Sequence, residues 1–318
     1  MKKLLVLPLI IFLFNCESHI KNSDKKVVIE EGTQVEEIPN QDVKETTVTE
    51  IHYSTDSLIG FWVGYFLKDD DFDRSVRMGE YDSWNKENKI NISIDKIDGD
   101  KVIGHSVVAG NDRPFKGTMK KESNGVYAFD VKEPGDHKYD GAFQFKIHLE
   151  NNQMIGKWRA YKEINIRKRT YNLDKKVFKY NPNHQLNWMT YKDWNKTKNV
   201  EKSAEYEDGI IETWMEEAMV QSTHASQEIN ASTTLLKKED VENLSKTDLM
   251  IIRNTIYARH GYSYKNQPLR VFFDRQPWYI PVHTDIRAHL TDIEKQNIKL
   301  LLKYEKNASE YYDTFGRG

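Results

Sequence analysis

The chain has 318 residues, with 47 lysines and arginines against 49 aspartates and glutamates. A net charge of −2 excludes the strongly basic surface of a dedicated nucleic-acid binder, so no nucleic acid is expected as a partner. The length accommodates one large domain or two modest ones. Its 17 tyrosines and 7 tryptophans supply material for cores and for surfaces that bind sugars or proteins.

The N-terminus has the pattern of an export signal. Lys2 and Lys3 precede an apolar run over residues 4–14. The run is too short to cross a bilayer as a helix, but it fits the apolar part of a secretory signal peptide. It ends at Asn15-Cys16, which resembles a bacterial lipobox. The resemblance implies removal of residues 1–15 and attachment of a lipid to Cys16.

Cys16 is also the only cysteine of the chain. A single cysteine cannot form an internal disulfide, and lipidation explains why an exported chain keeps it. We therefore expect a lipid-anchored protein of the cell envelope with the membrane as a partner; an ordinary signal peptide with an incidental cysteine is the alternative. Glu17 rather than aspartate follows the cysteine, which favours the outer membrane and leaves open the periplasmic or surface face.

Residues 16–56 are acidic and nearly free of aromatic side chains, which predicts a disordered tether. Residues 57–172 then alternate between apolar and polar side chains, as half-buried strands do. Turn residues separate the alternating runs and predict eight strands, at 58–66, 89–97, 101–109, 113–121, 125–132, 141–150, 153–161 and 164–171. Eight antiparallel strands at hairpin spacing predict a closed up-and-down β-barrel.

The first strand opens with Gly60-Phe61-Trp62, which resembles the G-x-W element of lipocalins. The resemblance implies that Trp62 closes one end of the barrel under an arginine of the last strand, Arg167 or Arg169. Such a barrel either holds a small apolar ligand or is filled by its own side chains. The inward faces are rich in phenylalanine and isoleucine, which favours a filled barrel.

The connector, residues 173–234, has a less regular pattern. Residues 209–221 place Ile210, Trp214, Met215, Ala218 and Met219 near helical spacing, which predicts an amphipathic helix. Residues 222–234 are small and polar and predict a loop.

Residues 235–306 predict a small, mainly helical module, followed by a tail over residues 307–318. Its expected helices cover residues 237–244, 245–260 and 291–306. Ser245 with Asp248, and Thr291 with Glu294, have the spacing of helix N-caps with capping boxes. Gly261 stands where a left-handed residue ends a helix. The fold class is therefore α+β multidomain.

The second of these helices carries Tyr257-Ala258-Arg259-His260-Gly261, the sequence that names the YARHG domain family, which this module resembles. The resemblance extends to further positions: Arg253, Asn254, Tyr262, Tyr264, Phe272, Phe273, Trp278, Tyr279, Glu294 and Asn297. It implies a small extracellular module found on varied bacterial envelope proteins, without an established molecular function.

Two interpretations of these residues remain open. Arg253, Tyr257 and His260 share a helix face, because their spacing is i, i+4 and i+7. The structural interpretation is one buried polar network, comprising Arg253, Asn254, Tyr257, Asp274, Glu294 and Asn297. The functional interpretation is a recognition groove for an anionic sugar or a peptide carboxylate, lined by Arg259, His260, Tyr262, Trp278 and Tyr279.

Catalytic and metal signatures are not evident. The sequence has no G-x-S-x-G or H-E-x-x-H motif, and no zinc-type histidine spacing. The acidic run at residues 69–73 lacks the glycine and glutamate of an EF-hand loop. We therefore expect no metal, no cofactor and no enzyme activity, but a lipoprotein that binds an envelope glycan, peptide or protein. A lipocalin-type carrier and an unrecognised envelope hydrolase are the alternatives.

Overall fold

The computed structural model describes residues 53–69 and 87–309. The signal peptide, Cys16, most of the expected tether, most of the acidic run at residues 69–73 and the end of the tail lie outside these residues. Within the described part, no helix combines the length and apolar character needed to span a bilayer.

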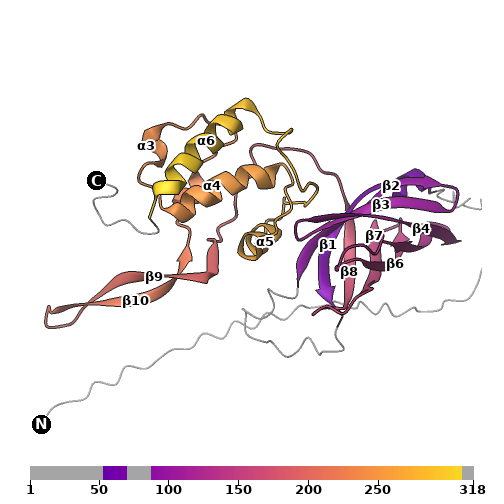
Figure 1. The fold of residues 1–318 in the computed structure, drawn as a ribbon, viewed down its shortest axis with the longest axis horizontal. Coiled ribbons are helices and arrows are strands. Elements are labelled where there is room, and N and C mark those ends of the chain that lie inside the picture. Colours follow the sequence, from indigo (N-terminus) through magenta and orange to yellow (C-terminus); the bar gives the residue numbers. More distant parts are fainter. Residues whose placement is uncertain (1–52, 70–86, 310–318) are drawn as a thin grey trace, which may run out of the picture. The chain divides into compact units, whose positions relative to one another are not determined.

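A closed antiparallel barrel of eight strands makes up the first part of the described chain, as expected (Figure 1). The strands are β1 (Gly60–Lys68), β2 (Asn88–Asp98), β3 (Lys101–Val108), β4 (Asn111–Ser123), β5 (Val126–Lys132), β6 (Gly141–His148), β7 (Gln153–Ala160) and β8 (Lys168–Lys176). Each pairs with the next along the chain, and β1 closes the barrel against β8. No open strand edge therefore remains in the barrel.

The interior of the barrel is filled by its own side chains. Ile92, Phe143 and Phe145 point inward and are 4% exposed or less, as the alternating pattern predicted. The rings of Phe129 and Phe145 stack with their centroids 4.7 Å apart. Such packing is that of a protein core, so the centre of the barrel does not favour a carrier with its ligand deep inside.

One end of the barrel is closed by a short 3₁₀-helix, η1 (Thr55–Leu58), and by Trp62. The indole Nε1 of Trp62 donates to the carbonyl oxygen of Leu58 at 3.0 Å. The cation over its ring is Lys175, whose Nζ lies 4.6 Å from the ring centroid.

The assignment of Arg167 to this closure was therefore wrong. Trp62 pairs with Lys175 in the β1–β8 register, whereas Arg167 precedes β8 at the opposite end of the barrel. There it forms an ion pair with Glu163. Arg169 also lies at that opposite end, where its Nη1 donates to the carbonyl oxygen of Phe66 at 2.7 Å.

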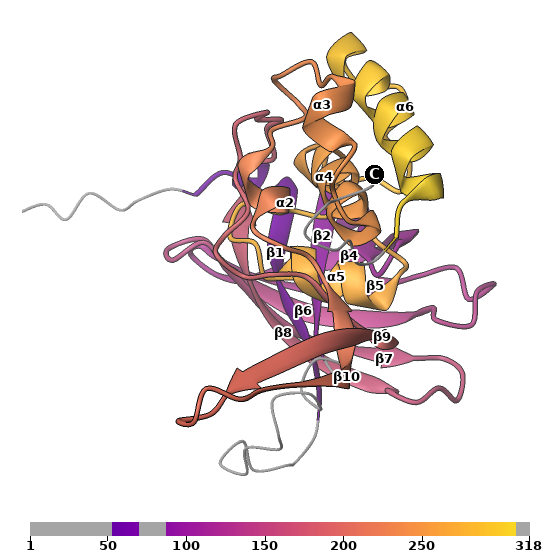
Figure 2. The ribbon, with the colours of Figure 1, turned by 90° about the vertical axis from the view of Figure 1, so that its left-hand side faces the viewer.

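The prediction of an amphipathic helix at residues 209–221 was also wrong. This segment is strand β10 (Ile211–Gln221), paired with β9 (Lys192–Glu205) in a two-stranded ribbon (Figure 2). Gly209 has φ = +79° and makes the turn after Asp208, a dipeptide that favours hairpins. The helical spacing was incidental, because Trp214 and Met215 are exposed on opposite faces of the ribbon.

The C-terminal region is helical and packs around two buried clusters. Its helices are α2 (Ala225–Glu228), α3 (Lys238–Val241), α4 (Lys246–Arg259), α5 (Gln267–Asp274) and α6 (Asp292–Asn307). The expected caps are confirmed: Ser245 accepts from the Asp248 amide, and Thr291 and Glu294 form a capping box. Gly261 ends α4 with φ = +71°. Helices α2 and α5 were not predicted; Asn266 and Pro268 are the start signals of α5.

The barrel and the helical region are joined by buried polar contacts, and both belong to one compact unit. The backbone amide of Lys89 donates to Oδ2 of Asp274 at 2.8 Å. Its Nζ donates to the carbonyl oxygens of Gln276 and Tyr279 at 2.9 and 3.0 Å. The hydroxyl of Tyr65 donates to the Asp274 carbonyl. We call this set of contacts the seam.

Candidate functional site

A groove of about 650 Å³ lies beside the seam and is called the seam groove. Barrel residues, the chain after β8 and the helical region all contribute to its walls. Three of the five residues expected to form a recognition groove line it, namely Arg259, Trp278 and Tyr279. His260 and Tyr262 do not line it.

Arg259 ends helix α4 and is only 4% exposed. Its Nε and Nη2 donate to the carbonyl oxygen of His184, and its Nη1 donates to Oδ1 of Asn230 and Oγ of Ser232. All these acceptors are neutral, and within the described residues Arg259 forms no ion pair. Burial lowers the pKa of Arg259 to about 10, which still leaves the guanidinium charged at neutral pH.

Lys89 brings a second buried cation to the groove. Burial lowers its pKa to about 8, and the nearby charge of Asp274 partly offsets this effect. Lys176 and Lys179 lie at the exposed rim. Four cationic side chains therefore line the groove, whereas none of the described residues that line it is aspartate or glutamate. The site is electrostatically suited to an anion.

Aromatic rings form one wall of the seam groove. The indole Nε1 of Trp278 donates to the carbonyl oxygen of Gln185 at 2.7 Å, and its ring stacks on His184 at 4.9 Å. Tyr180 also lines the groove. Its hydroxyl donates to Glu294 at 3.0 Å, and burial together with this carboxylate raises the pKa of Tyr180 to about 12. These contacts hold the wall in a fixed position.

His260 and Tyr262 serve the core instead of the groove. His260 is 4% exposed, its Nε2 lies 2.7 Å from Oε2 of Glu294, and its ring stacks on Tyr180 at 4.2 Å. Tyr262 accepts through its carbonyl oxygen from the hydroxyl of Tyr279 at 2.7 Å. The expected groove is therefore built from only part of the expected set.

The single polar network expected in the module is divided among separate partners. Arg253 binds Glu305 through two hydrogen bonds of 2.9 Å, and its guanidinium lies 5.6 Å from the ring centroid of Tyr257. The Nδ2 of Asn254 donates to the Met250 carbonyl one turn earlier in α4. Arg253 and Tyr257 therefore form one local pair beside Glu305, whereas Asn254 bonds within its own helix.

The remaining three members each bind a different segment. Asn297 fixes the chain before α3, because it donates to the carbonyl oxygens of Ala231 and Thr234 and accepts from the Leu236 amide. Glu294 binds His260 and accepts from the Thr291 amide. Asp274 faces the barrel and accepts from the Lys89 amide. The six residues therefore stabilise the module, but as several anchors instead of one network.

The groove residues that the sequence did not indicate are Lys89, Tyr180 and His184. Lys89 opens a strand whose alternation gave no sign of a buried cation. Tyr180 and His184 lie in an irregular segment whose pattern predicts no element. In the described part of the chain, no group of three histidine, cysteine, aspartate or glutamate side chains is arranged to hold a metal ion.

Comparison with known proteins agrees with the motif in α4. Residues 225–306 match the YARHG domain family, so the helical region is a YARHG domain. The match begins at α2, ahead of the expected start at residue 235. No curated protein matches the chain significantly. No solved structure does so either, so no matched structure supports the resemblance of the barrel to lipocalins.

Proposed function

We propose that this chain, which joins a closed barrel to a YARHG domain, is a non-catalytic binding lipoprotein of the bacterial cell envelope. It is anchored in the outer membrane through a lipid on Cys16. Its ligand at the seam groove is an acidic envelope glycan. The observation that carries the proposal is the combination of four cations, no lining carboxylate and an aromatic wall.

The chemistry of the groove supports a sugar acid over a neutral sugar. The two buried cations, Lys89 and Arg259, are bound only to neutral acceptors, so their charges remain available to a ligand. A carboxylate that displaces water near a cation gains more binding free energy in a partly buried site than at an open surface. Trp278 and Tyr180 offer rigid aromatic surfaces for sugar rings. A peptide carboxylate would use the same cations without the aromatic wall.

The experiment that tests the proposal is calorimetric titration of the purified protein with acidic muropeptides and with neutral chitin oligosaccharides of matched length. We expect binding of the acidic ligand and at least tenfold weaker binding of the neutral one. Equal binding of both, or binding of neither together with no sedimentation with purified sacculi, would contradict the proposal.

Two rim lysines allow a test without disturbing the core. The double substitution Lys176→Glu and Lys179→Glu reverses charge at the exposed rim of the groove. We expect at least a tenfold loss of affinity for the acidic muropeptide. The matched control is Lys120→Glu with Lys121→Glu on strand β4, two exposed lysines outside the groove, which should leave the affinity unchanged.

The anchor is tested separately by the Cys16→Ala variant. A chain without the lipidated cysteine has no long apolar span among its described residues to hold it in a bilayer. We expect the variant in the soluble fraction and the wild-type protein in the membrane fraction. A variant that stays in the membrane would contradict lipid anchoring and leave the groove proposal untouched.

A further inference from the structure

The open end of the barrel holds a second cavity, of about 850 Å³, which we call the mouth. It lies opposite the end that Trp62 closes. Its floor consists of Phe66, Phe143 and Trp158, and its rim includes Arg169 from β8 and Arg270 from α5. A cavity of this size falls in the range of small-molecule sites.

The floor of the mouth is a packed aromatic cluster. The ring of Phe66 lies 5.5 Å from Trp158 and 6.3 Å from Phe143, measured between centroids. All three side chains are 5% exposed or less. Below them, Phe115 and Ile92 belong to the filled core. The mouth therefore offers an apolar surface of limited depth.

Two arginines stand at the rim of this apolar floor. Arg169 is 8% exposed, and its guanidinium lies 5.0 Å from the ring centroid of Phe66. Burial, and then the charge of Arg270, lower the pKa of Arg169 to about 10. Two cations that repel each other in a partly buried site are stabilised by an anion placed between them.

Arg270 has unused capacity to bind such an anion. Its Nη1 donates to the Lys265 carbonyl at 3.3 Å, and its buried Nε has no hydrogen-bond partner. Within residues 53–69 and 87–309 it forms no ion pair. A buried N–H donor without an acceptor costs free energy that a ligand carboxylate or phosphate would recover.

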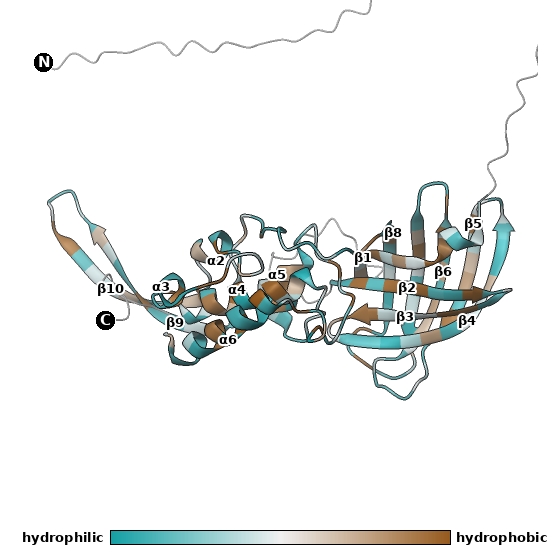
Figure 3. Ribbon diagram, turned by 90° about the horizontal axis from the view of Figure 1, so that it is seen from above, coloured by the Kyte–Doolittle hydropathy of each residue, from teal (hydrophilic) through white to brown (hydrophobic). Residues whose placement is uncertain are grey.

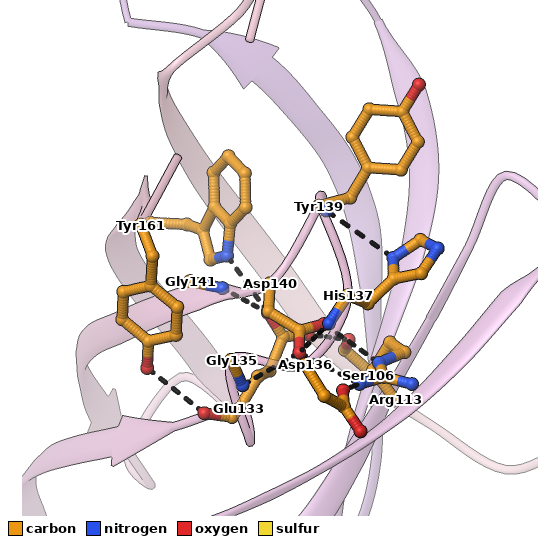
Figure 4. A network of polar contacts seen from close by, with 11 residues as sticks. Ser106, Arg113, Glu133, Gly135, Asp136, His137, Tyr139, Asp140, Gly141 and Tyr161 are labelled. Carbon is orange, nitrogen blue, oxygen red and sulfur yellow. Dashed lines mark hydrogen bonds and ion pairs between the residues drawn. The ribbon is translucent and has the colours of Figure 1, made fainter. Parts of the chain in front are cut away.

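The carboxylate nearest the floor is already used by other groups. Glu133 accepts from Oγ of Ser106 at 3.0 Å, from the Gly141 amide at 2.7 Å and from Nε1 of Trp158 at 3.4 Å. Figure 4 shows Glu133 beside Asp140, which Arg113 binds through two hydrogen bonds of 2.8 Å. These bonds fix the β5–β6 loop, and the Nε of Arg270 is the rim donor that a ligand would satisfy.

We propose that the mouth is a second ligand site, for a single-chain amphiphile with an acidic head, either a carboxylate or a phosphate. The head binds Arg270 beside the positive charge of Arg169, and the first part of the chain covers Phe66, Phe143 and Trp158. Because one arginine belongs to the barrel and the other to the YARHG domain, the ligand joins the two across the seam. This inference does not depend on the seam groove.

Calorimetric titration with soluble amphiphiles below their micelle concentrations tests the acidic head. We expect dodecanoate and dodecyl phosphate to bind at least tenfold more tightly than dodecanol or dodecyltrimethylammonium. The ratio of the affinities for dodecanoate and dodecyl phosphate shows which acidic head is preferred. Acetate and inorganic phosphate, which lack the chain, should bind at least a hundredfold more weakly. Equal affinity for charged and neutral heads, or for heads with and without the chain, would overturn the proposal.

Variants at the rim locate the site. Arg270→Gln should lower the affinity for dodecanoate at least tenfold and leave that for dodecanol unchanged. The matched control is Arg287→Gln, an exposed arginine outside the mouth, which should behave as wild type. Lys265 is an exposed residue at the rim, and Lys265→Gln gives a second test if Arg270→Gln folds poorly. This substitution should lower the affinity for dodecanoate about threefold. Retention of the acid preference in both rim variants would overturn the proposal.

Chain length distinguishes the mouth from a hollow barrel. Each buried methylene should raise the affinity about fourfold until the floor is covered. Because the core below the floor is filled, the affinity should rise from hexanoate to octanoate and level off by dodecanoate. A continued rise to hexadecanoate would place the chain inside the barrel and overturn the assignment to the mouth.

Discussion

At the scale of single residues, partly buried cations that donate their hydrogen bonds to neutral acceptors are the recurring feature. Lys89, Arg259 and Arg270 are each held by neutral acceptors, and each has a pKa lowered mainly by burial. Natural cores usually pair such charges, since an isolated buried ion costs several kcal/mol. Three such cations beside two cavities are the basis of the proposal that both cavities bind anions.

Glu133 gives a prediction in pH. Burial raises its pKa from 4.5 to about 7, so the folded protein binds this proton more tightly than the unfolded chain. Its contribution to stability is therefore full below pH 4.5 and is lost as the pH rises through 7. Between pH 5 and pH 8 the free energy of unfolding should fall by about 2 kcal/mol on account of this group. Asp274, with its pKa raised to about 7, acts in the same direction.

The Glu133→Gln variant isolates this effect in urea unfolding at pH 5 and pH 8. The amide cannot ionise, so the wild type should lose about 2 kcal/mol of unfolding free energy relative to the variant from pH 5 to pH 8. Glu122→Gln, at an exposed glutamate paired with Lys146, serves as the control and should keep the wild-type pH dependence. An identical pH dependence in wild type and Glu133→Gln would show that the buried carboxyl stays ionised.

At the scale of elements, the barrel was predictable because its strands alternate strictly and its hairpin turns are marked by glycine and asparagine. The helices α4 and α6 were predictable because their capping residues, Ser245 and Thr291, stand at the positions where a helix begins. The errors fall where two patterns compete. Ile211–Gln221 has apolar residues at helical spacing, and its strand partner β9 has no apolar face that would have revealed the pairing.

The sites were less predictable than the elements. Arg259 and Trp278 belong to a recognisable motif, whereas Lys89 and His184 reach the same groove from distant parts of the chain. Lys175 instead of Arg167 covers Trp62 because register, which the sequence does not reveal, decides which residue of β8 lies beside it. Contacts made by tertiary packing leave no local pattern to detect.

The ribbon of β9 and β10 carries a prediction at this scale. Nearly all its side chains are exposed, and brown, hydrophobic stretches lie along it among teal ones (Figure 3). A two-stranded ribbon without a core beneath it is only marginally stable in water. In hydrogen exchange of the purified protein, we expect the amides of β9 and β10 to exchange at least tenfold faster than those of the β5–β6 hairpin. Equal protection of both would mean that another chain covers the ribbon.

At the scale of the whole molecule, the seam determines whether barrel and YARHG domain act as one body. Both cavities lie beside it, and each takes residues from both sides. The two cavities, and with them the two proposed ligand sites, are therefore complete only when the domains are docked. Loss of docking should lower the affinity for both proposed ligands together, although they bind at separate places.

Lys89 is the residue whose removal tests this dependence. Lys89→Met keeps the length of the side chain but leaves the carbonyl oxygens of Gln276 and Tyr279 without their donor. An unsatisfied buried acceptor costs about 1–3 kcal/mol, so we expect a lower unfolding temperature in calorimetry and at least tenfold weaker binding of both acidic muropeptide and dodecanoate. Lys96→Met on the same strand, at an exposed lysine, is the control and should change neither. A variant that loses muropeptide but retains full affinity for dodecanoate would mean that Lys89 acts only through its charge in the seam groove and does not hold the domains together.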